Sequence, residues 1–66
     1  MNRRYQIQAT VARTEDGRTI TKQIPTFYLH KDVQGIMDTD HAILIARQII
    51  DPFQMFEVRG TATECE

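Results

Sequence analysis

Residues 20–29 read ITKQIPTFYL, and the apolar positions change register in the middle of this stretch. Ile24 is even-numbered, like the isoleucine four residues before it, whereas Phe27 and Leu29 are odd-numbered. Successive side chains of a strand point to opposite faces, so an uninterrupted strand cannot place both sets in one core. Because proline donates no ladder hydrogen bond, Pro25 predicts a bulge, a bend or a sheet edge at this point.

A regular strand precedes this stretch. Tyr5, Ile7 and Val11 occupy odd positions and alternate with polar residues, which predicts a half-buried strand with its odd positions facing inward. Asp16-Gly17 follows, and both residues tolerate a positive φ, as a tight hairpin turn requires. We therefore expect residues 18–29 to form a second strand, antiparallel to the first.

A helix is predicted over residues 39–50. Asp38 can accept hydrogen bonds from the first turn, and Asp51-Pro52 ends the helix because a residue before proline is pushed out of the α region. The helical period gives an apolar face of Ala42, Ile43, Ala46, Ile49 and Ile50, with Ile45 at its margin.

The remaining segments are a connection and a third strand. Three apolar residues of the connection, Val33, Ile36 and Met37, are expected to anchor it against the core. In the third strand the even positions Phe56, Val58 and Ala62 are expected to face inward. Gly60 shares their parity and suggests a bulge or a close approach of the helix. The last two or three residues are expected to fray.

These elements predict one small α+β domain over residues 1–66, in the order β-β-α-β. The sheet has three strands, is mainly antiparallel, and is covered by one helix on one face. The third strand can lie beside the first, giving the order 2-1-3, or beside the second. The other face is expected to be polar and to carry Gln6, Gln8, Thr10, Thr19, Thr21, Gln23, Glu57, Arg59 and Thr61.

Length and charge exclude several classes of function. The chain has 66 residues with eight basic and nine acidic side chains, so it has no global attraction to nucleic acid or to an anionic membrane. No apolar run reaches the roughly 18 residues of a membrane span, and we expect no secretion signal. A lone cysteine, Cys65, favours the reducing cytoplasm. So short a chain has a small core, and association is a common remedy.

Candidate chemistry is sparse. The chain has no serine, and Cys65 lies in the terminal segment, so no nucleophile is held for catalysis and we expect no enzyme. The densest group of ligand-type residues is His30, Asp32, Asp38, Asp40 and His41. It matches no metal motif, so helix capping and a solvated loop account for it, and no metal or cofactor is expected. A small-ligand or metal carrier using this region is the third hypothesis for function.

A nucleic-acid-binding domain is the second hypothesis. The outer sheet face would supply Lys22 and Arg59 as phosphate contacts and Tyr28 as a stacking ring. RNA-binding sheets carry two or three such aromatic residues on their surface, whereas most aromatic residues of this chain are predicted to face inward.

The first hypothesis comes from apolar residues that the predicted fold does not use. Leu44 lies opposite the core-facing side of the helix, and Tyr28 and Met55 fall on the parity opposite to their inward neighbours. Single exposed apolar residues are common, but such residues also mark interfaces. We therefore predict a non-enzymatic protein-interaction module that binds itself, as a dimer, or a protein partner. Its small size suggests a phage or mobile-element type regulator or inhibitor of a host protein.

Overall fold

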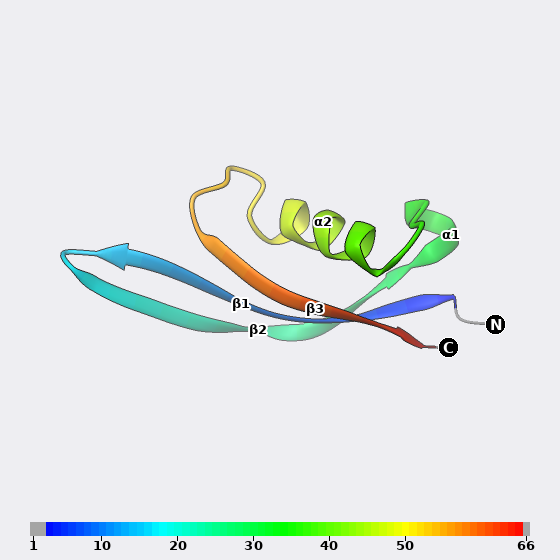
Figure 1. Cartoon of the computed structure of the whole chain (residues 1–66), viewed down its shortest axis with the longest axis horizontal. Helices are drawn as coiled ribbons and strands as arrows, with labels where there is room; N and C mark the ends of the chain where they lie inside the picture. The colour runs from blue at the N-terminus through cyan, green and yellow to red at the C-terminus, as the bar shows by residue number, and fades with distance from the viewer. Residues whose placement is uncertain (1–2, 66) are drawn as a thin grey trace.

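A computed structural model describes residues 3–65 (Figure 1). Along the chain, the elements are β1 (Arg4–Glu15), β2 (Arg18–His30), α1 (Lys31–Gln34), α2 (Thr39–Ile50) and β3 (Glu57–Cys65). β1 is the central strand and pairs antiparallel with both neighbours, so the sheet order is β2-β1-β3. The predicted α+β architecture is confirmed, as is the order 2-1-3 over its alternative. The short helix α1, within the predicted connection, was not expected.

The register break in β2 is a β-bulge. Ile7 of β1 lies opposite Phe27 and Ala9 lies opposite Ile24, so two steps along β1 face three steps along β2. The extra residue falls in the segment that contains Pro25. As a result Ile24 and Phe27, whose numbers differ in parity, both pack against the core. The prediction made from Pro25 is confirmed.

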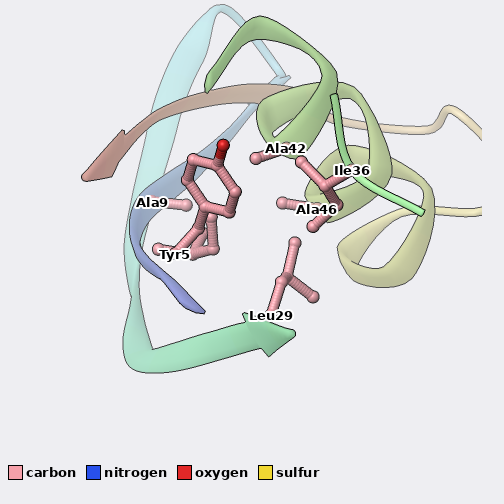
Figure 2. Close-up of a cluster of buried hydrophobic side chains, with 7 residues drawn as sticks. Tyr5, Ala9, Leu29, Ile36, Ala42 and Ala46 are labelled. Carbon is pink, nitrogen blue, oxygen red and sulfur yellow. The ribbon is translucent and has the colours of Figure 1, made fainter. Parts of the chain in front are cut away.

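The core lies between the sheet and α2. It consists of Tyr5, Ile7, Ala9, Leu29, Ile36, Ala42 and Ala46. Figure 2 shows Tyr5 and Ala9 on the sheet facing Ala42 and Ala46 on the helix. Because these two helix residues carry only a methyl group each, α2 can lie close to the strands. Its first turn is capped as predicted, since an oxygen of Asp38 accepts a hydrogen bond from the His41 N–H at 2.8 Å.

α2 packs mainly on β3 and, to a lesser extent, on β1. The helix is therefore displaced from the middle of the sheet, and the side of α2 that faces away from β3 is left uncovered. Ile49 lies on that side and is 54% exposed, so its predicted burial is wrong. Ile43 and Ile50, on the side toward β3, are half-buried.

Only one of the three expected anchors of the connection reaches the core. Ile36 is buried, whereas Val33 and Met37 are 80% and 81% exposed. Gly35 takes a left-handed conformation with φ of 64°, which ends α1 and turns the chain toward the core at the next residue. Val33 is left on the outside of this turn.

β3 also differs from the prediction at both ends. It begins at Glu57, so Phe56 lies outside the strand and is exposed. It continues to Cys65, which pairs with Arg4, so the predicted fraying is wrong for residues 64 and 65. For Glu66 this prediction lies outside the described residues. At Gly60 the close neighbour is β1 and not the helix: an added Cβ would lie 3.1 Å from the Gln8 carbonyl oxygen.

The β1–β2 hairpin extends beyond β3. Pairing with β3 ends at Ala12 opposite Glu57, and residues 13–20 continue as a two-stranded hairpin arm (Figure 1). The molecule is consequently elongated, 46 by 18 by 15 Å. Its radius of gyration is 12.9 Å, against about 10.8 Å for a compact chain of this length.

Candidate interaction surface

A groove of about 530 Å³ runs between α2 and β3. Leu44, Arg47 and Gln48 line its helix side, and Glu57, Val58 and Arg59 line its strand side. The connection from α2 to β3 closes one end. Both apolar and charged side chains line the groove.

One wall of the groove is an open strand edge. β3 pairs with β1 on one side, and within the described residues no strand pairs with its other side. Its nine residues contain no proline, and its pairing with β1 runs without a bulge from Glu57 to Cys65. Such an edge presents backbone N–H and C=O groups that can pair with another strand.

A stripe of residues on the surface of α2 lies beside this edge. Asp40, Ile43, Leu44 and Arg47 follow the spacing i, i+3, i+4, i+7, which places them along one side of a helix. Leu44 is 54% exposed. Asp40 and Arg47 are exposed, and neither forms an ion pair within residues 3–65. We call these four residues the α2 stripe.

Asp51 fixes the end of the groove. Its buried carboxylate accepts hydrogen bonds from the Met55 N–H at 3.0 Å and the Phe56 N–H at 2.7 Å. The backbone carbonyl oxygen of Asp51 accepts a further hydrogen bond from the Gln54 N–H. Gln54 has a positive φ of 55°. These bonds hold residues 51–56 in a tight turn that directs the chain into β3. From the sequence, Asp51 was recognised only as a helix terminator.

The three residues predicted to contact a partner are all exposed, but they do not form one patch. Leu44 lines the groove. Met55 lies in the turn between α2 and β3. Tyr28 pairs with Gln6 on the outer face of the sheet, away from α2. Of the three, only Leu44 belongs to the groove.

The residues of the nucleic-acid hypothesis are also dispersed. Lys22 lies opposite Val11, which places it on the helix-facing side of the sheet, so its expected outer-face position is wrong. Arg59 is on the outer face and forms an ion pair with Glu57 at 2.9 Å. The Arg4 guanidinium lies 5.0 Å from the centre of the Tyr28 ring. One aromatic ring and one paired arginine make a poor surface for stacked bases.

The ligand-type residues of the connection make local hydrogen bonds. His41 Nδ1 accepts a hydrogen bond from the Met37 N–H at 3.1 Å, and Asp38 caps α2. Across residues 3–65, His, Cys, Asp and Glu side chains nowhere gather in a group of three that could hold a metal ion. In the same part of the chain, no helix has the length and apolarity to cross a membrane.

Tyr5 joins β1 to the end of β3. Its hydroxyl donates a hydrogen bond to Glu64 at 3.0 Å. Burial of the ring raises the pKa of Tyr5 above its ordinary value of 10.0, and the hydrogen bond to Glu64 and the negative charges of Glu64 and Asp38 raise it further. The neutral phenol is thus the form that the folded state favours.

A pH dependence of stability follows from the raised pKa of Tyr5. The unfolded chain loses the phenol proton near pH 10 while the folded chain keeps it, so the folded state is destabilised as the pH rises above 10. In Tyr5→Phe this part of the decline is expected to be absent. Urea unfolding at several values between pH 8 and pH 11 measures it. Equal declines in the two proteins would contradict the assignment.

Comparison with known proteins gives no match: no protein-family model fits the chain, and no characterised protein or solved structure is significantly similar to it.

Proposed function

We propose that this chain is a non-enzymatic protein-interaction module that binds an extended segment along the β3 edge. The observation that carries the proposal is the position of the open edge beside the groove that Leu44 lines. An added strand would hydrogen-bond to β3 and place alternate side chains against α2.

Strand addition separates affinity from specificity. The backbone hydrogen bonds are independent of sequence, whereas the pockets that receive alternate side chains select the partner. Here the selecting surface is Leu44 with Arg47 and Gln48. Fully burying a leucine side chain contributes about 1.5–3 kcal/mol, so Leu44 can account for a useful share of the affinity of a weak complex.

The chemistry of the groove supports binding rather than catalysis. Its polar side chains are arginine, glutamine and carboxylates, one arginine being already paired with Glu57. Neither histidine is among the residues that line it, and Cys65 is at the far end of β3. The lone cysteine favours the cytoplasm. In keeping with the size of the chain, we propose a small regulator or inhibitor of phage or mobile-element type.

Leu44→Glu is expected to abolish binding through the groove. A carboxylate at this position would have to be desolvated when the groove closes, while the core beneath α2 is untouched because Leu44 faces away from it. Peptides selected from a displayed random library against the original protein supply the probe, with binding measured by fluorescence anisotropy. We expect at least a tenfold loss of affinity, about 1.4 kcal/mol, with an unchanged circular dichroism spectrum.

Val33→Glu is the matched control. Val33 is also an exposed apolar residue on a helix, but it lies on α1, outside the groove. The control variant is expected to bind like the original protein. If Leu44→Glu binds the selected peptides as tightly as Val33→Glu does, the groove is not the binding surface.

A further inference from the structure

We infer that the segment added to the β3 edge is β3 of a second copy of the chain, in a two-fold dimer centred on Thr61. This inference rests on the proposed function, because it names the occupant of the same edge and groove. The two sheets would join into one of six strands, with both α2 helices packed side by side on one face.

The exposed area of the chain is larger than that of a compact monomer. The accessible surface is 5098 Å², whereas a compact monomer of 7.7 kDa exposes about 4,330 Å². Part of the excess of about 770 Å² comes from the protruding hairpin arm of residues 13–20. Beside the β3 edge, the exposed Leu44 and Phe56 side chains contribute to it, and a standard interface buries roughly 800 Å² per partner.

β3 is compatible with antiparallel pairing to its own copy. Thr61 is the midpoint of Glu57–Cys65, and a two-fold axis there pairs residues of equal parity, so both helices lie on the same face. The resulting cross-strand pairs are Glu57 with the partner's Cys65, Val58 with the partner's Glu64, Arg59 with the partner's Thr63, and Gly60 with the partner's Ala62. No two like charges are directly opposed in this register. Like charges in opposed positions would destabilise the pairing.

The same axis passes close to the middle of the α2 stripe. α2 and β3 run in opposite directions, as Figure 1 shows. Ile43 of the stripe and Thr61 of β3 line the same small cavity between these two elements. The middle of the stripe, at residues 43 and 44, therefore lies near the level of Thr61.

At this position the charges of the stripe are complementary. Asp40 and Arg47 are seven residues apart with their midpoint beside Leu44, so two antiparallel copies of α2 bring Asp40 opposite the partner's Arg47, twice by symmetry. Ile43 and Leu44 occupy the middle of the stripe, with Ile43 on the side toward β3, so they lie between these pairs. This arrangement uses the apolar residues and both unpaired charges of the stripe at once.

Two measurements test this inference. One is the molar mass of the original protein in solution, and the other is the effect of exchanging the charges at positions 40 and 47. Light scattering over a range of concentrations is expected to give twice 7.7 kDa. Arg47→Asp places like charges opposite each other and is expected to raise the dimer dissociation constant at least tenfold. The double variant Asp40→Arg/Arg47→Asp restores opposite charges and is expected to recover most of that loss. If the double variant is as weak as the single one, the helix pairing is overturned.

Crosslinking tests the strand register independently. With Cys65→Ser as background, Thr61→Cys places two cysteines on the axis, where opposed Cα atoms are about 4.5–5.5 Å apart, within the range of a disulfide. We expect rapid oxidation to a covalent dimer. Thr19→Cys in the same background, on the hairpin arm, is expected to form no covalent dimer. Equal crosslinking of both variants would overturn the register.

The outcomes also separate this inference from the proposed function. If the original protein is a monomer at millimolar concentration while selected peptides bind and require Leu44, the second copy is excluded as the occupant and the interaction module stands. If the protein dimerises and Leu44→Glu affects neither dimer nor peptide, the groove is not the interface and both proposals fail.

Discussion

Replacing Ile7 by alanine should remove about half of the stability of the fold. Ile7 is 1% exposed in the centre of β1, opposite Phe27 on one side and Ala62 on the other. Truncating a buried isoleucine costs about 2–5 kcal/mol, which includes the cavity left behind. A 66-residue chain has about 3–10 kcal/mol of stability in total, so this loss is about half of the total.

Urea unfolding followed by circular dichroism measures this effect. Ile20→Ala removes the same atoms from the hairpin arm, where Ile20 is 56% exposed, and is expected to cost less than about 1 kcal/mol because little apolar area is lost from contact. The difference between the two variants reports on the core alone. Similar midpoints for both would mean that Ile7 is not the centre of the packing.

Replacing Asp51 by alanine is the second change expected to have a large effect. Its carboxylate accepts two backbone hydrogen bonds, from Met55 and Phe56, and it is buried. A hydrogen bond to a charged group contributes about 1.5–3 kcal/mol, so we expect a loss of about 3 kcal/mol. Because the turn of residues 51–56 positions the start of β3, the loss should also weaken binding through the groove.

Two further variants separate the hydrogen bonds from the charge. Asp51→Asn keeps one side-chain oxygen as an acceptor and turns an amide toward the second N–H, so its stability should fall between those of the original protein and Asp51→Ala. Asp32→Ala removes an exposed carboxylate from α1 and is expected to change the free energy of unfolding by less than about 0.5 kcal/mol. An unaltered midpoint in Asp51→Ala would show that water replaces the carboxylate.

Much of the fold could be predicted from local chemistry. The parity change across Pro25 predicted a bulge, a bend or an edge, of which the bulge occurs, and Asp38 and Asp51-Pro52 specified both ends of α2. The position of α2 across the width of the sheet was not predictable in this way. The helical period identifies the apolar side of α2 but not the strands beneath it, so Ile49 was assigned to the core although α2 is displaced toward β3.

The candidate surface was predicted only in part. Leu44 was recognised because it lies opposite the core-facing stripe of the helix. The relevance of Asp40 and Arg47 depends on which strand edge lies beside them, and this requires the sheet order and the position of α2. Lys22 was misplaced although it shares the even parity of Ile24 before the bulge, which puts it on the helix-facing side. Asp51 was missed since its partners depend on the direction of the turn after Pro52.

The bulge at Pro25 has a consequence for the size of any assembly. A molecule that offers two usable strand edges can add copies at both sides and grow into a ribbon without limit. In this chain the outer edge of β2 is interrupted by an extra residue and a proline, so its row of backbone groups is out of step with a straight neighbour. Among residues 3–65, β3 is the outer strand whose edge is regular over its whole length, so the proposed dimer would not be expected to grow further. The bulge that reconciles two apolar registers within one strand would thereby also keep such an association finite.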